Sequence, residues 1–412
     1  MATRLDPGWG GISATRLLAF RYLKRYDPVF LLEKAVSDTV KNAQPSDDVH
    51  VALGERSYTI RIVSQASSQF GNFARQSLDA SWAGQGCKRG LIVTDKNVRP
   101  IAERLAGSLA GAGIETDQVV MEPGEETKSL AAASKLWDLL VGHRADRHTV
   151  VIAVGGGVIG DLAGFVAATY ARGLPLLMVP TSLLAQVDSS VGGKVGINHP
   201  EVKNILGAFH QPAGVWIDTE FLETLPPRQF HCGLAEVVKY GVILDEPFFQ
   251  ELENAEPDIL AMDPVWLRRI VSRSCELKAQ VVEQDERETT GIRAALNFGH
   301  TIGHAIEAVA GYGGAYNHGE AVSVGMVAET RIAERLGWID AGTRRRIELL
   351  LGRFGLPTAA PELETEPLLE AMTRDKKNRA GTIRFVLPRR LGHVELTDVV
   401  TPELIRSVLD AQ

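Results

Sequence analysis

The chain has 412 residues, of which 45% are hydrophobic and 23% charged, and this length predicts two or three domains with full-sized cores. Its 44 basic and 51 acidic residues give a net charge of −7, which argues against a nucleic-acid coat or a polybasic membrane binder. Three widely spaced cysteines favour a reducing, cytoplasmic location over a disulfide framework. No apolar run approaches the roughly 20 residues of a membrane span, and the unusual feature is the 40 glycines, which cluster.

Residues 1–48 differ in character from the rest of the chain. Their apolar stretch, Leu17–Phe20, is interrupted by Arg21, so the segment lacks a signal-peptide core. A basic transit peptide stays open, although the acidic residues nearby weaken it. We favour a dispensable or dimer-packing N-terminal extension, joined to the folded part by a linker at 44–48.

The first half of the folded part alternates between short apolar strands and helical stretches. Alternating apolar residues between His50 and Val63 predict a two-stranded hairpin. Further strands are predicted at 90–95, 118–121, 149–154 and 176–179, with helices over 70–78, 98–112 and up to about residue 140. This order predicts an α/β domain with a mostly parallel sheet and ligand sites at the carboxyl ends of its strands.

A glycine cluster directly follows the strand at 149–154. Gly155, Gly157 and Gly160 satisfy G-x-G-x-x-G between a strand and a helix, where bare amides can hold a pyrophosphate. No acidic residue lies between Asp161 and Asp188, so the acid that usually binds the ribose must come from elsewhere. Asp95, at the end of an earlier strand, is the candidate. The alternative is a tight turn that only packs a helix on a strand.

A second segment, Pro180–Lys194, is predicted to be a loop of small residues that carries hydroxyl groups, one acid and one lysine. Lys203 and Asn204 follow in a similar setting. Together with Lys194 they form a candidate phosphate cradle. Taken singly, each of them is more typical of a solvated surface residue.

Two predicted helices of the second half carry charges among apolar residues. Glu236 and Lys239 are the only firmly charged side chains at 229–244, so they predict either an internal ion pair or a ligand role. The next helix should start at Asp263, an N-cap before a proline. Lys278 falls on its apolar stripe, and a lysine that points inward needs an anionic partner.

The strongest chemical signal is a set of histidines. His300 and His304 are four residues apart on a predicted helix, and His318 opens another one. Glu236, His300 and His318 would form a two-histidine, one-carboxylate set for a zinc-type ion with open positions, leaving His304 for proton transfer. Capping and core histidines are the alternative reading.

In these residues the sequence resembles the dehydroquinate synthases, a family of sugar phosphate cyclases. The resemblance covers about residues 51–396, nearly everything except the N-terminal extension. It rests on long strings, which are Gly155–Tyr170, Pro180–Asn198, Leu234–Lys239, Leu296–Glu307, His318–Gly325 and Asp375–Lys377.

After the extension at 1–48, the resemblance implies a Rossmann-like NAD-binding domain at 49–225 and an all-α metal- and substrate-binding domain at 226–412, with the active site in the cleft between them. It implies zinc or cobalt on Glu236, His300 and His318. It also implies that NAD is held by Asp95, Asn97, Glu125, Lys128, Gly156, Gly157, Val158, Asp161, Thr181, Ser182, Leu184, Asp188, Ser189, Lys203, Phe221, Thr224 and Leu225.

The implied substrate is 3-deoxy-D-arabino-heptulosonate 7-phosphate, an intermediate of the shikimate pathway to aromatic amino acids. The implied reaction is redox-neutral: transient oxidation by NAD, β-elimination of phosphate, re-reduction and intramolecular aldol closure to 3-dehydroquinate. Lys278 and Arg293 would face the substrate carboxylate, and Glu288 is a further substrate residue. The phosphate would meet Lys194, Asn204, Asn297, one of Lys376 and Lys377, and Arg172 of the partner in a homodimer. Lys194, Lys239, Lys278, Arg293, Asn297 and His304 would take part in catalysis, with the leaving phosphate as a base.

The sequence departs from the family pattern at four places. Ser182 replaces the usual Thr and keeps the hydroxyl, whereas Gln229 replaces a Glu. One residue is inserted near Thr289, which affects the match of Glu288, and about two are inserted at 313–316, before His318.

Four alternative functions stay open. A sister cyclase of the valiolone type usually has Pro in place of His304 and differs at Asn297, and an aminodehydroquinate synthase is harder to exclude. An iron-containing alcohol dehydrogenase would bring three metal histidines and an Asp. A binding module without catalysis would have lost part of the metal set, which is complete here.

Overall fold

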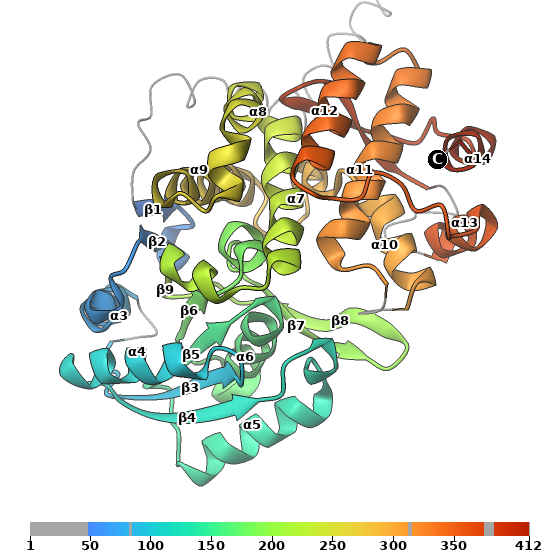
Figure 1. Ribbon diagram of the computed structural model, residues 1–412. Coiled ribbons are helices and arrows are strands. Elements are labelled where there is room, and N and C mark those ends of the chain that lie inside the picture. Colours follow the sequence, from blue (N-terminus) through green and yellow to red (C-terminus); the bar gives the residue numbers. More distant parts are fainter. Residues whose placement is uncertain (1–47, 82–84, 312–314, 375–382, 412) are drawn as a thin grey trace, which may run out of the picture.

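The computed structural model describes residues 48–81, 85–311, 315–374 and 383–411. The extension at 1–47, the predicted phosphate residues Lys376 and Lys377, and part of the insertion before His318 lie outside these ranges. The chain forms a sheet with flanking helices, in blue to green, next to a largely helical part, in yellow to red (Figure 1). Within the described ranges, no helix combines the length and apolarity that a membrane span requires.

The first part is built on a seven-stranded sheet with the strand order β1-β2-β9-β6-β5-β3-β4. Only β1 and β2 pair antiparallel, so the predicted hairpin and the mostly parallel sheet are both confirmed. The strands are β1 (Asp48–Val51), β2 (Tyr58–Val63), β3 (Arg89–Asp95), β4 (Glu115–Met121), β5 (Thr149–Gly155), β6 (Leu176–Pro180) and β9 (Gly214–Asp218).

Helices cover both faces of this sheet because its central strands are apolar on both sides. In β5, Ile152 and its alternate neighbours join a core with α3 (Phe70–Ala80) and α4 (Arg99–Gly111). Val151 and Ala153 point the other way, toward α5 (Leu130–Gly142) and α6 (Gly157–Thr169). The first part is therefore a three-layer α/β arrangement.

The segment predicted as a small-residue loop has more structure than expected. It contains a π-helical turn, η5 (Ala185–Ser189), and its last residue, Lys194, starts a hairpin of β7 (Lys194–His199) and β8 (Val202–Phe209). Two glycines interrupt the apolar alternation by which these strands could have been predicted. Gly196 and Gly207 face each other across the hairpin, and a Cβ on Gly196 would lie 2.8 Å from a backbone oxygen of β8. The loop prediction, which ended at Lys194, was therefore wrong for the η5 residues, and the hairpin that follows was not predicted.

The second part is helical, as predicted, with one added hairpin of β10 (Phe385–Arg390) and β11 (His393–Thr397). Asp263 caps α9 by accepting hydrogen bonds from the backbone of Val265 and Trp266, which confirms the predicted helix start. The helices are α7 (Pro227–Leu244), α8 (Glu246–Leu260), α9 (Pro264–Gln284), α10 (His300–Val309), α11 (His318–Arg335), α12 (Ala341–Arg353), α13 (Thr365–Arg374) and α14 (Pro402–Leu409).

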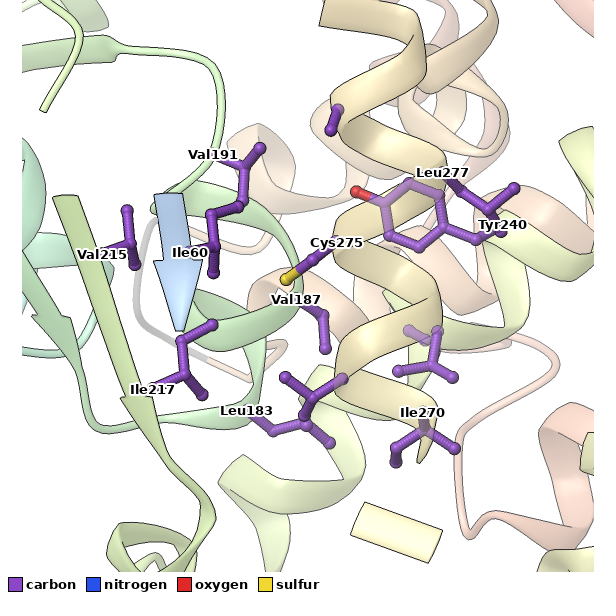
Figure 2. Close-up of a cluster of buried hydrophobic side chains, with 14 of the residues drawn as sticks. Ile60, Leu183, Val187, Val191, Val215, Ile217, Tyr240, Ile270, Cys275 and Leu277 are labelled. Atoms are coloured by element: carbon purple, nitrogen blue, oxygen red, sulfur yellow. The ribbon is translucent and has the colours of Figure 1, made fainter. Parts of the chain in front are cut away.

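A shared apolar core joins the two parts. In Figure 2, Cys275 and Ile270 of α9 lie near Val187 of the η5 turn and Ile60 of the sheet, and all four are buried. The predicted domain boundary at 225/226 falls just before α7 and stays a prediction, because the core is continuous across it.

Candidate active site

The carboxyl edge of the sheet has its switch point between β3 and β5. These strands are neighbours, but the chain leaves β3 toward β4 on one side and reaches β5 on the other. Such a switch point is where open α/β sheets bind ligands. Asp95 ends β3 there, and the predicted glycine turn follows β5. The Asp95 carboxylate accepts a hydrogen bond from the backbone of Asn97, which orders the predicted ribose-binding turn.

At the start of α6, the backbone of the glycine turn lies close to neighbouring side chains. No side chain caps this helix, whose N-cap is Gly156, so its first N–H groups are available to an anion. A Cβ on Gly157 would lie 3.2 Å from the Ser189 hydroxyl oxygen, and one on Gly155 only 2.7 Å from the side chain of Ile159. The residues present therefore fit a dinucleotide pyrophosphate.

Polar residues link this turn to the β7–β8 hairpin. Lys128 is buried, and its Nζ lies 2.7 Å from the Asp161 carboxylate and also donates to Asn204. Burial raises the pKa of Asp161, and the Lys128 ammonium opposes that rise. Asn198, at the end of β7, donates to Glu125 at 2.8 Å. Four predicted ligand residues thus meet in one cluster.

Asp188 in the η5 turn connects the sheet to the helical part. Its Oδ1 accepts hydrogen bonds from the Tyr240 hydroxyl and the Lys278 ammonium, each at 2.7 Å. Burial alone would raise the pKa of Asp188, but Lys278 and Lys239 outweigh it and hold that pKa well below its usual range. The sequence predicted an anionic partner for the inward Lys278 without deciding between the protein and a substrate. In the structure this partner is the carboxylate of Asp188.

The remaining predicted cofactor residues lie in the segments that directly follow strands β5, β6 and β9. Ser182 precedes η5 and its hydroxyl accepts from the backbone of Ala185, while Thr181 donates its backbone N–H to Gly155. The others are Val158 in α6, Leu184 and Ser189 at the η5 turn, and Phe221, Thr224 and Leu225 in or after the turn Thr219–Thr224.

Three helices bring the predicted metal ligands together. Glu236 comes from the middle of α7 and is fully buried, whereas His300 and His318 open α10 and α11. Glu236 Oε1 lies 3.6 Å from His300 Nε2 and 3.8 Å from His318 Nε2. Its other oxygen pairs with Lys239, so the internal ion pair is present, while the ligand role of Glu236 stays a prediction.

The donor set fits a divalent ion of the zinc type. Ligand atoms around tetrahedral zinc are about 3.3–3.5 Å apart, only slightly closer than these atoms. Glu236 Oε1 is buried without a hydrogen-bond donor among the described residues, which suits an oxygen that binds a cation. His304, Glu307 and His318 form a second convergent set, but there His318 Nδ1 already contacts Glu307 at 3.1 Å. The first set is therefore the better candidate.

A loop after α9 holds the residues predicted to bind substrate. Glu288 pairs with Lys194 and lies 3.7 Å from the Arg293 guanidinium, which itself donates to the backbone oxygens of Gly192 and Glu286. Asp285 organises this loop: its carboxylate accepts four backbone N–H groups, from Thr289, Thr290, Gly291 and Arg293. The residue inserted near Thr289 therefore lies within this loop.

Two further predicted substrate residues lie on neighbouring turns. Asn297 ends the turn Ile292–Asn297, three residues before His300. Arg172 is exposed on the turn after α6, with the left-handed φ of 68°.

Sequence reasoning missed three residues with polar contacts in this region. Tyr240 contacts Asp188, Asn198 contacts Glu125, and Glu307 contacts both His318 and Lys203. Burial alone would raise the pKa of Glu307, but the hydrogen bond from His318 and the charges of His318 and Lys203 lower it to about 2. Its spacing from His304, one helical turn, was the available signal.

The fold and site define a class of proteins in which a dinucleotide-type sheet adjoins a helix-borne metal set. Residues 118–232 match the family model described as 3-dehydroquinate synthase N-terminal, and residues 233–378 match the one described as 3-dehydroquinate synthase C-terminal. A 3-dehydroquinate synthase from Desulforamulus reducens is 48% identical over 364 residues, which are 88% of this chain and 99% of that protein. The chain therefore belongs to the 3-dehydroquinate synthase family.

Solved structures of sister cyclases have the same architecture. The 2-epi-5-epi-valiolone synthase from Streptomyces hygroscopicus subsp. jinggangensis, with NAD+ and Zn2+ bound, has a TM-score of 0.77 and 28% identity over 87% of this chain and 98% of that one. A 2-deoxy-scyllo-inosose synthase complexed with carbaglucose-6-phosphate, NAD+ and Co2+ has a TM-score of 0.76 and 26% identity over 88% and 99% of the chains. The predicted fold class is confirmed.

Proposed function

We propose that this chain is an NAD- and metal-dependent lyase that converts 3-deoxy-D-arabino-heptulosonate 7-phosphate to 3-dehydroquinate and phosphate. The observation that carries the proposal is the convergence of Glu236 Oε1 with His300 Nε2 and His318 Nε2, in a chain of this family. The η5 turn links this set to the glycine turn, since Asp188 contacts α7 while Ser189 lies against Gly157. These contacts support a shared reaction space for the proposed metal ligands and the predicted dinucleotide site.

The chain's own residues have distinct tasks in this reaction. When bound, the dinucleotide supplies reversible hydride transfer, and the metal ion polarises the oxygens of the substrate. Arg293, held by Gly192 and Glu286, presents a fixed guanidinium to the substrate carboxylate. Lys194 and Asn204, on the β7–β8 hairpin, bind the phosphate group.

Proton transfer falls to His304. It follows His300 by one helical turn, and the two ring centroids are 5.3 Å apart, so His304 faces the same space without belonging to the first metal set. An imidazole next to the proposed metal site can take a substrate proton directly or through the departing phosphate.

A phosphate-release assay tests the proposed reaction. Purified protein with NAD and Zn2+ or Co2+ should release inorganic phosphate from the heptulosonate phosphate without net accumulation of NADH. Steady NADH formation from a simple alcohol would instead support an alcohol dehydrogenase. The donor set argues against that class, because it combines a glutamate with two histidines.

A sister-cyclase function is the second candidate. Both solved relatives named above are cyclases of other sugar phosphates, so fold and metal set alone do not select the substrate. Asn297 and His304 favour the heptulosonate phosphate. Offering this compound and sedoheptulose 7-phosphate in parallel, and identifying the carbocyclic product, distinguishes the two functions.

We also propose that the protein is a cytoplasmic homodimer. The three cysteines are free and buried, which suits a reducing compartment. On β8, Ile205, Leu206 and Phe209 are 46%, 37% and 42% exposed, and an apolar strand edge is a template for pairing with a second chain. Analytical ultracentrifugation should show a dimer, and the Phe209→Glu variant should shift it toward monomer. A parent protein that is monomeric at micromolar concentration would contradict the proposal.

A further inference from the structure

Glu307 is a buried carboxylate to which the proposed chemistry gives no task. It lies on α10, and only 6% of its surface is exposed. Its Oε2 is 3.1 Å from Nδ1 of His318, and its Oε1 is 3.1 Å from Nζ of Lys203. One side chain thus contacts the first residue of α11 and strand β8 of the hairpin.

The contact with His318 has a defined chemical meaning. The two ring nitrogens of His318 point to different partners: Nε2 to Glu236 and Nδ1 to Glu307. An imidazole that binds a metal through Nε2 carries its proton on Nδ1, and that N–H needs an acceptor that fixes the ring. Glu307 Oε2 is placed to accept it.

The contact with Lys203 accounts for the second oxygen. A carboxylate at this depth is costly unless it is paired, and Lys203 brings a positive charge to it. Lys203 also lies 3.9 Å from Glu125, one of the predicted dinucleotide residues. Glu307 therefore connects the metal ligand His318 to the polar cluster of the sheet.

We propose that Glu307 is a positioning residue of the metal centre, which orients His318 by accepting its Nδ1–H and anchors the β7–β8 hairpin through Lys203. The inference rests on the proposed metal-dependent function. It assigns different tasks to the two oxygens: Oε2 supports metal affinity, and Oε1 supports the hairpin.

Metal affinity is the measurement that tests this proposal. Zn2+ and Co2+ are titrated into metal-free protein in competition with a chromophoric chelator. Glu307→Ala should weaken metal binding by roughly 10- to 100-fold, the usual effect of losing a carboxylate behind a metal-bound histidine. Glu307→Gln, which keeps an acceptor oxygen but loses the charge, should lie between this variant and the parent. The visible spectrum of bound Co2+ should change in Glu307→Ala.

Two control variants separate positioning from general stability. Lys203→Met removes the contact with Oε1 and the longer one with Glu125 but leaves the contact between Oε2 and His318, so it should bind metal within about threefold of the parent, well under one 1.4 kcal/mol step. Asp245→Asn removes another buried ion-paired carboxylate, 2.7 Å from Arg273, and should lower the melting temperature without weakening metal binding.

The outcomes are distinguishable. A folded Glu307→Ala variant with the metal affinity and Co2+ spectrum of the parent would overturn the inference. A parent that binds neither ion would instead contradict the proposed metal-dependent function itself. If Glu307→Ala does not fold without metal, unchanged affinity in Glu307→Gln together with weakened affinity in Lys203→Met overturns the assignment of the two oxygens.

Discussion

The glycine turn after β5 and the metal set differ in how the chain builds them. The turn is local: a strand, three glycines and a helix start follow one another, and backbone groups make the site. The metal set gathers single side chains from α7, α10 and α11, far apart in the sequence. A local site depends on the space that glycine leaves, whereas a convergent site depends on helix packing. The two should therefore respond to different mutations.

His300→Ala should have the largest effect, and only on the convergent site. It removes one of the three proposed metal ligands, so metal content should fall and phosphate release should drop by roughly 10³-fold or more, the several kcal/mol that a metal contributes. The affinity for NAD, measured by the quenching of protein fluorescence, should change little. A variant with the metal content and activity of the parent would refute the assigned ligand.

Gly319→Ala should damage the same site through packing. A Cβ on Gly319 would lie 2.0 Å from the Cys232 carbonyl oxygen, so α11 must move away from α7 and carry His318 away from Glu236. We expect a loss of about 1–3 kcal/mol in the free energy of unfolding and weaker metal binding. Chemical denaturation and the chelator competition measure the two effects, and retained metal affinity despite lost stability would show that the helices need not meet this closely.

Gly157→Ala should damage the local site and leave the convergent one intact. The added methyl group would lie 3.2 Å from the Ser189 hydroxyl, on the backbone that faces the predicted pyrophosphate. We expect NAD to bind about tenfold more weakly, or 1.4 kcal/mol, with unchanged metal affinity. Gly107→Ala is the matched control, because a Cβ there meets nothing within 4 Å. Equal NAD affinity in both variants would argue against a pyrophosphate at this turn.

The sequence predicted the local site better than the convergent one for physical reasons. Strand, glycines and helix start are neighbours in the chain, so their pattern already contains the geometry of the turn. The ligands Glu236, His300 and His318 were predicted as residues, but their approach depends on Gly319 against Cys232, a contact that no local pattern encodes. Glu307 was missed for the same reason, since both of its partners come from other elements. The β7–β8 hairpin was missed because glycines interrupt its alternation.

Asp285→Asn should have a smaller effect, on the substrate loop alone. Burial would raise the pKa of Asp285, but hydrogen bonds from the backbone of Thr290, Arg293 and Thr289 and from the Thr290 side chain outweigh burial and lower this pKa. A lowered pKa stabilises the fold above the unfolded value of about 3.9, and this contribution is lost as the pH falls through the folded pKa. The variant should thus be less stable by about 2 kcal/mol near pH 7, and the difference should shrink below about pH 4.

The same variant also distinguishes a loop effect from an effect on either cofactor site. Asp285 fixes the backbone that carries Glu288 and Arg293 and contacts no predicted ligand of the metal. The KM for the heptulosonate phosphate should therefore rise while the affinities for NAD and metal stay unchanged. Denaturation at pH 7 and at about pH 3, which is below the unfolded pKa, together with the KM checks both parts. If the stability difference is the same at the two pH values, the negative charge of Asp285 does not hold the loop.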